Sequence, residues 1–115
     1  MTTLGTFDYD KLFAGDAEVV REKAVAGAAM VRGTVVGKIT ASGKVIAADS
    51  AAVDGSKEPY GILADDVAAD GDPAVLYMTG EFNEDALTFG GADTADTHRL
   101  ALRKIGIFLK QNQEA

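Results

Sequence analysis

Valine, isoleucine and threonine are concentrated between residues 18 and 40, and glycines interrupt them at short intervals. The stretch contains Val19, Val20, Val25, Val31, Thr34, Val35, Val36 and Ile39, together with Gly27, Gly33 and Gly37. Side chains branched at Cβ fit a pleated sheet better than a helix, and frequent glycines favour short strands that bend. The pattern therefore predicts a small domain built mainly from β-strands.

Further strands are expected over residues 44–48, 60–64, 74–82 and 107–110. The first of these returns from a hairpin turn at Ala41–Gly43, and polar or acidic loops separate the others. Pro59 stands at the entry of its strand, where a missing N–H removes no ladder hydrogen bond. Gly80 lies inside the longest predicted strand and indicates a bulge or a close approach of the backbone.

One helix is predicted, near the C-terminus. Asp93 is the expected N-cap, and Asp96 three residues later completes a pattern like a capping box. Gly106 suits the position just beyond the helix end. The apolar stripe consists of Ala95, His98, Ala101, Leu102 and Ile105. The predicted class is α+β, mostly β: a compact β-rich domain with one C-terminal helix and an extended N-terminal arm.

Residues 1–16 differ from the rest of the chain. Phe7, Tyr9 and Phe13 are spaced so that an extended backbone places them on one face. Disordered, solvated tails are poor in aromatic residues. Two hypotheses remain open, a first strand packed on its own domain and an arm that docks on a partner, and the arm is preferred. The predicted organisation is an arm over residues 1–16 and a single domain over residues 17–115.

Composition limits the classes of function. The 115 residues suffice for one domain, and 18 acidic against 11 basic residues give a net charge of −7. The basic residues are scattered, so nucleic-acid binding is not expected. No run of about 18 apolar residues exists, so no membrane span is expected. The start of the chain lacks the pattern of a signal peptide, and the absence of cysteine fits synthesis in a reducing cytoplasm.

No catalytic, cofactor or metal site is predicted. His98 is the only histidine, and its place in the apolar stripe favours a hydrogen-bonded packing residue over a catalytic base. The three serines lack the flanking pattern of a nucleophile elbow, and the glycines form no phosphate-binding motif. The densest acidic cluster does not follow the spacing of a calcium loop, and a solvated loop is expected there. Its members are Asp65, Asp66, Asp70 and Asp72.

Two segments carry a resemblance to a known family. They are Lys57-Glu-Pro-Tyr-Gly-Ile-Leu-Ala-Asp-Asp66 and Leu87-Thr-Phe-Gly-Gly-Ala-Asp-Thr-Ala-Asp-Thr-His-Arg-Leu-Ala-Leu-Arg-Lys-Ile-Gly-Ile-Phe-Leu-Lys110. From about Ala14 to Lys110 the chain resembles the lambda-type head decoration proteins of tailed bacteriophages. The resemblance implies a structural virion protein made in the host bacterial cytoplasm. As a homotrimer it would bind the major capsid protein at three-fold positions on the outside of the expanded capsid. There it would stabilise the shell against the pressure of packaged DNA.

The resemblance also implies roles for individual residues. The N-terminal arm of that family orders on the capsid and extends a sheet there, which is strand addition. Mapped onto this chain, the arm is residues 1–16, and its expected capsid-binding side chains are Leu4, Phe7, Tyr9, Leu12 and Phe13. Independently of the resemblance, helical spacing places Leu100 away from the apolar stripe of the predicted helix, which makes it a candidate for the trimer interface.

Two other classes of function compete with decoration. The segment Arg32–Thr40 is similar to the β-turns of small β-barrel binding or carrier modules, but neither Lys38 nor Lys44 has the flanking residues of a modified carrier lysine. A small hydrolase would need a nucleophile or carboxylate beside His98, and no sequence motif places one there. The chain is therefore expected not to be an enzyme.

Overall fold

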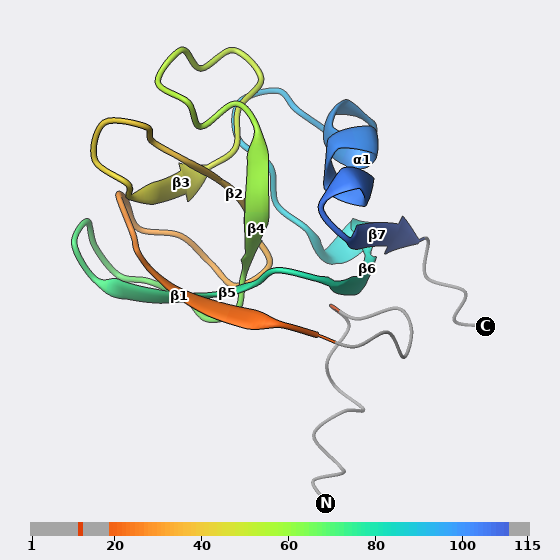
Figure 1. The fold of residues 1–115 in the computed structure, drawn as a ribbon, viewed down its shortest axis with the longest axis horizontal. Helices are drawn as coiled ribbons and strands as arrows, with labels where there is room; N and C mark the ends of the chain where they lie inside the picture. Colours follow the sequence, from red (N-terminus) through yellow and green to blue (C-terminus); the bar gives the residue numbers. More distant parts are fainter. Residues whose placement is uncertain (1–11, 13–18, 111–115) are drawn as a thin grey trace, which may run out of the picture.

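A computed structural model describes Leu12 and residues 19–110 of the chain, and these residues form two sheets and one α-helix (Figure 1). The antiparallel sheet has the strand order β1-β5-β4-β2-β3, and a second sheet pairs β6 with β7 in parallel. The elements are β1 (Arg21–Val25), β2 (Val35–Lys38), β3 (Val45–Ala47), β4 (Pro59–Leu63), β5 (Pro73–Tyr77), β6 (Gly80–Asn83), the short 3₁₀ helix η2 (Glu84–Ala86), α1 (Ala95–Lys104) and β7 (Ile107–Lys110). The predicted class, mostly β with one helix near the C-terminus, is confirmed.

The five-stranded sheet curls until its two edge strands meet. Ala26, just after β1, forms a bridge with Val45 at the start of β3, and the Gly27 amide donates to the Val45 carbonyl at 2.8 Å. Only glycine fits here without a shift, because a Cβ on Gly27 would lie 2.8 Å from Cγ2 of Ile46. The glycine-rich sequence that predicted bending strands is thus used where the sheet closes on itself.

The predicted strand over residues 74–82 is wrong as a single element. The chain leaves the five-stranded sheet after Tyr77, turns, and begins β6 at Gly80, whose φ is +144°. The backbone of Val20 holds this turn. The Met78 amide donates to the Val20 carbonyl at 2.6 Å, and the Thr79 hydroxyl accepts from the Val20 amide at 3.2 Å. A contact between residues far apart in sequence therefore divides a segment that the sequence pattern predicts as one strand.

The core has two parts on opposite sides of the central strands. Neighbouring residues of a strand point to opposite faces, so Val35 and Ile62 enter one cluster while Val36 and Leu63 enter the other. The first cluster lies against α1, which packs on β7 and β4, and Leu102 is the buried helix residue in it. Burial on both faces explains why β2 and β4 are apolar without alternation.

The ends of the helix are partly as predicted. Gly106 has φ +94° just beyond the last turn, which confirms its terminal role. The N-cap is Thr94 and not Asp93: the Thr94 amide donates to the Thr97 hydroxyl at 3.0 Å in a capping box. Asp93 is displaced from the cap because its carboxylate is engaged by another loop, as the next subsection describes.

Candidate interaction surfaces

Asp93 connects the start of α1 to the loop that follows β3. Its carboxylate accepts from the Ser50 amide and from the Ser50 hydroxyl, both at 2.7 Å, and lies 2.7 Å from Nε2 of His98. The side chain is almost fully buried. The hydrogen bond from the Ser50 hydroxyl is the main reason that the pKa of Asp93 lies below its ordinary value, with a further contribution from His98.

His98 is a packing residue with a hydrogen bond, as predicted. It is buried, stacks on Phe89 with ring centroids 5.8 Å apart, and bonds to Asp93 through Nε2. The Ser50 hydroxyl donates to Oδ1 of this carboxylate and His98 bonds to Oδ2, so the serine hydroxyl bonds to the acid and not to the imidazole. A serine hydrolase needs its hydroxyl on the histidine. The contact is therefore that of a structural bridge between loop and helix.

Arg99 forms a second bridge, on the side of α1 that faces η2. Its guanidinium contacts Glu84 at 2.9 Å and Asp96 at 2.8 Å. The two carboxylates, Glu84 above all, raise the pKa of Arg99, so its charge is permanent. These ion pairs of Arg99 therefore hold η2 against the helix.

The acidic loop after β4 makes separate local contacts. Asp66 accepts from the Arg32 amide at 2.7 Å, Asp72 accepts from the Ala69 amide at 3.1 Å, and Asp70 pairs with Lys44 at 2.8 Å. Within the part of the chain that the structure describes, no three acidic or histidine side chains gather in a way that could hold a metal ion. In the same part, no helix is long and apolar enough to cross a membrane.

Leu12 lies within the proposed arm but is fastened to the domain. Its side chain is only 3% exposed and belongs to the core cluster under α1, and its carbonyl accepts from the Asn83 amide of β6 at 2.6 Å. In this structure Leu12 is therefore a core residue of its own domain, and its contact with a capsid stays a prediction. The other predicted capsid-binding side chains, Leu4, Phe7, Tyr9 and Phe13, lie outside the described residues.

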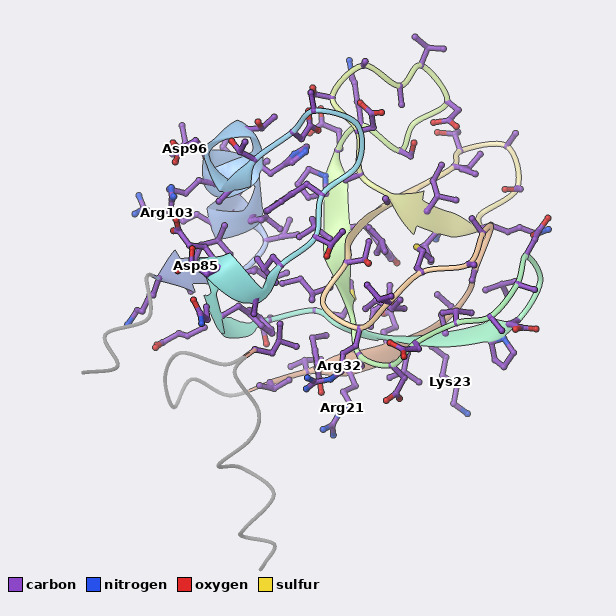
Figure 2. All side chains as sticks on the ribbon, turned by 180° about the vertical axis from the view of Figure 1, so that it is seen from behind. Arg21, Lys23, Arg32, Asp85, Asp96 and Arg103 are labelled. Atoms are coloured by element: carbon purple, nitrogen blue, oxygen red, sulfur yellow. The ribbon has the colours of Figure 1, made fainter. Side chains whose placement is uncertain are left out.

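The outer face of α1 presents an apolar residue among positive charges. Leu100 is 69% exposed, and Arg103 and Lys104 lie next to it at helical spacing. Arg103 points away from the domain (Figure 2). Among the described residues neither Arg103 nor Lys104 has a carboxylate partner. The predicted candidate for a subunit contact is thus in an accessible place.

An open groove of about 480 Å³ lies between the closing point of the curled sheet and the loop after β3. Its apolar lining includes Ala28, Ala29, Met30, Ile39 and Ile46. Two carboxylates, Asp49 and Asp54, belong to its wall. The hydroxyl of Ser56 donates to Asp54 at 2.5 Å and lowers the pKa of this carboxyl, so the acid is ionised at neutral pH.

A third surface, the edge strand β1, is charged. Arg21, Glu22 and Lys23 are exposed, and Figure 2 shows Arg21 and Lys23 pointing outward from it. Glu22 accepts from the Tyr60 hydroxyl at 2.9 Å, and Arg21 lies 5.4 Å from the Tyr77 ring centroid. Charged edge strands resist unwanted pairing with other sheets. Neither this role nor the groove could be predicted from the sequence, because both depend on which strands become neighbours.

Comparison with known proteins identifies the family of the chain. No curated protein sequence matches the chain. The family model described as bacteriophage lambda head decoration protein D matches residues 2–107. The match spans most of the chain, from residue 2 through strands β1 to β6 and helix α1 to the first residue of β7. The family is one of structural proteins associated with the phage capsid. This chain, with its bridged helix, exposed Leu100 face and β-rich domain, belongs to the bacteriophage lambda head decoration protein D family.

Proposed function

We propose that the protein is a homotrimeric cement for a bacteriophage head. It is synthesised in the cytoplasm of the host bacterium, binds the outer surface of the expanded capsid at three-fold positions, contacts the major capsid protein and stabilises the shell against the pressure of packaged DNA. The observation that carries the proposal is the family match over residues 2–107. The side-chain bridges that join α1 to the loop after β3 and to η2 support a mechanical role.

Residues 1–16 are the proposed capsid-binding arm, with Leu12 as its root. Leu4, Phe7, Tyr9 and Phe13 are the proposed contacts with the capsid, made by adding a strand to a capsid sheet. Ordering an arm residue costs about 1–2 kcal/mol. Burying a large apolar side chain returns about 1.5–3 kcal/mol, which offsets part of that cost. Because the Leu12 carbonyl accepts from the Asn83 amide of β6, the arm is anchored to the domain at this residue.

Trimer formation strengthens the binding. Three arms on one particle make the second and third binding events intramolecular, which raises the overall affinity far above that of one arm. The exposed apolar face of α1 around Leu100 is the proposed contribution of the helix to the trimer interface. An acidic exterior, from the net charge of −7, keeps decorated particles apart.

Co-sedimentation with expanded, undecorated heads of the phage tests the proposal. The purified protein is titrated onto heads, and bound copies per head are counted by quantitative gel densitometry. Binding that saturates at three copies per three-fold site is expected, while unexpanded proheads, as the control, bind less. A folded protein that does not bind expanded heads would contradict the decoration role and favour a small binding module instead.

A further inference from the structure

Two surfaces of the domain complement each other in polarity and charge. The outer face of α1 carries Leu100, 69% exposed, with the cations of Arg103 and Lys104 beside it. The groove near β3 is lined mainly by apolar side chains and includes the carboxylates of Asp49 and Asp54. Both lie in the described part of the chain, and neither is covered by another segment of it. A single exposed leucine is common and needs no explanation. A groove of matching polarity on the same molecule makes a contact between two copies the better interpretation.

The charges on the two surfaces are free to act between molecules. Arg99 is neutralised by Glu84 and Asp96, but Arg103 and Lys104 have no carboxylate partner in the described residues. Asp49 and Asp54 accept only local amide and hydroxyl hydrogen bonds, so their negative charge is not cancelled by a cation there. Opposite potentials across an interface fix its register and favour the correct partner.

The apolar parts also correspond. Ala28 and Ala29 are exposed, and Met30 and Ile46 are half-buried in the groove. Val53, completely exposed, stands between the lining residues Ala52 and Asp54. A leucine side chain entering the groove would remove apolar surface from water on both sides of the contact.

The two surfaces lie on different sides of the domain. Figure 1 shows α1 at the right of the view, and β3 with its neighbouring loops at the left. A contact between different patches is heterologous, and repeated around a symmetry axis it can close into a ring. Two-fold dimers, by contrast, use the same patch twice.

We propose that the groove lined by Ala29, Met30 and Ile46 receives Leu100 of a second copy of this chain, with Arg103 and Lys104 of that copy facing Asp49 and Asp54. The inference rests on the proposed homotrimer and names both halves of its interface. Each copy gives one helix face and receives one, so three identical contacts complete the ring.

Two substitutions, one on each surface, test the contact. Leu100→Asp places a negative charge against the acidic wall, and Ala29→Arg fills the groove with a bulky cation that repels Arg103. We expect each to weaken each subunit contact about 10- to 100-fold, in proportion to the apolar burial lost. The measurement is sedimentation velocity over a range of concentrations. Ala68, exposed and outside the groove, gives the matched controls Ala68→Asp and Ala68→Arg, which should remain trimeric.

Mixing the two variants gives a sharper result. The Leu100→Asp copy keeps an intact groove and the Ala29→Arg copy keeps an intact helix face, so an equimolar mixture can form one good contact per pair. A heterodimer that cannot close into a trimer is expected. Circular dichroism confirms folding, and Leu100→Gln repeats the test without a new charge.

Different outcomes of these experiments test the Leu100 interface and the homotrimer. A wild-type protein that stays monomeric at micromolar concentrations would refute the homotrimer and this interface with it. A wild-type trimer that survives both Leu100→Asp and Ala29→Arg would refute this interface alone and leave the trimer standing. Raised salt should also weaken the wild-type trimer, because the contact includes exposed charges, and an unchanged association constant would count against the charge pairing.

Discussion

Asp93 is the residue on which the polar contacts at the start of α1 converge. Replacing it by Asn keeps the shape but weakens the hydrogen bonds from Ser50 and removes the charge beside His98. We expect Asp93→Asn to lower the melting temperature by roughly 5 °C at pH 7. Ser50→Ala, which removes only the hydroxyl donor, should have a smaller effect. Thermal denaturation followed by circular dichroism measures both, and an unchanged midpoint for Asp93→Asn would contradict the bridge.

Acid should remove the stability that the Asp93 bridge contributes. The pKa of Asp93 in the folded protein lies below its ordinary value of 3.8. Its contribution to stability is therefore fully present above about pH 4, and it is lost as the pH falls through the lower, folded-state pKa. Asp93→Asn has no such group to protonate, so the difference in melting temperature between wild type and variant should narrow below pH 4. A difference that stays constant down to pH 2 would exclude this origin.

Leu12 is buried in the core, and its effect on stability can be distinguished from the effect of the proposed capsid contacts on binding. Truncating a leucine that is 3% exposed leaves a cavity in the cluster under α1, so we expect Leu12→Ala to lower the free energy of unfolding by about 2–5 kcal/mol. Leu4→Ala, at a proposed capsid contact, should leave the free energy of unfolding unchanged and weaken binding to heads. Urea denaturation gives the first quantity and co-sedimentation the second. Equal stability of Leu12→Ala and wild type would place Leu12 outside the core.

At the scale of elements, Gly80 decides where β5 ends and β6 begins. Its φ is +144°, and a Cβ there would lie 2.9 Å from the Phe82 ring. Gly71 provides a matched control, since its φ is +94° but no atom lies within 4 Å of its added Cβ. Gly71→Ala should cost about 1 kcal/mol from backbone conformation alone. Gly80→Ala should cost a further 1–2 kcal/mol, roughly, from the steric clash. Equal losses in urea denaturation would show that the Phe82 contact is relieved without strain.

In this fold, the features set by neighbouring residues could be predicted from the sequence, and the features set by distant residues could not. The hairpin at Ala41–Gly43, the final strand Ile107–Lys110 and the helix end at Gly106 follow from turn residues and periodicity, and the structure agrees. The division of residues 74–82 depends on Val20, which lies more than fifty positions away. No local pattern reports such a contact.

The polar bridge shows the same limit at the candidate site. Asp93 has the sequence context of an N-cap, but Ser50, 43 residues earlier, takes its carboxylate, and Thr94 caps the helix instead. The exposed position of Leu100 could be predicted because helical periodicity is local. The groove could not, because its lining comes from the bend at Gly27–Met30, from β3 and from the loop beyond it.

For the whole molecule, the arm and the domain should be separable at Leu12. Removing residues 2–11 deletes the proposed contacts Leu4, Phe7 and Tyr9 but keeps Leu12 in the core and its carbonyl bond to β6. We expect this truncated protein to fold with the stability of the full chain, to keep its trimer and to lose binding to expanded heads. Co-sedimentation and sedimentation velocity on the same preparation measure the two properties together.

Removing residues 2–16 is the informative comparison, because it takes Leu12 as well. A protein without that side chain should unfold about 2–5 kcal/mol more easily, so its failure to bind heads would not by itself identify an arm. The shorter truncation isolates the contribution of residues 2–11, since it removes three proposed capsid contacts while leaving the core and Phe13 in place. If the protein lacking residues 2–11 saturated heads at the full copy number, binding would reside in the remaining residues from Leu12 onward, and Phe7 and Tyr9 would need another role.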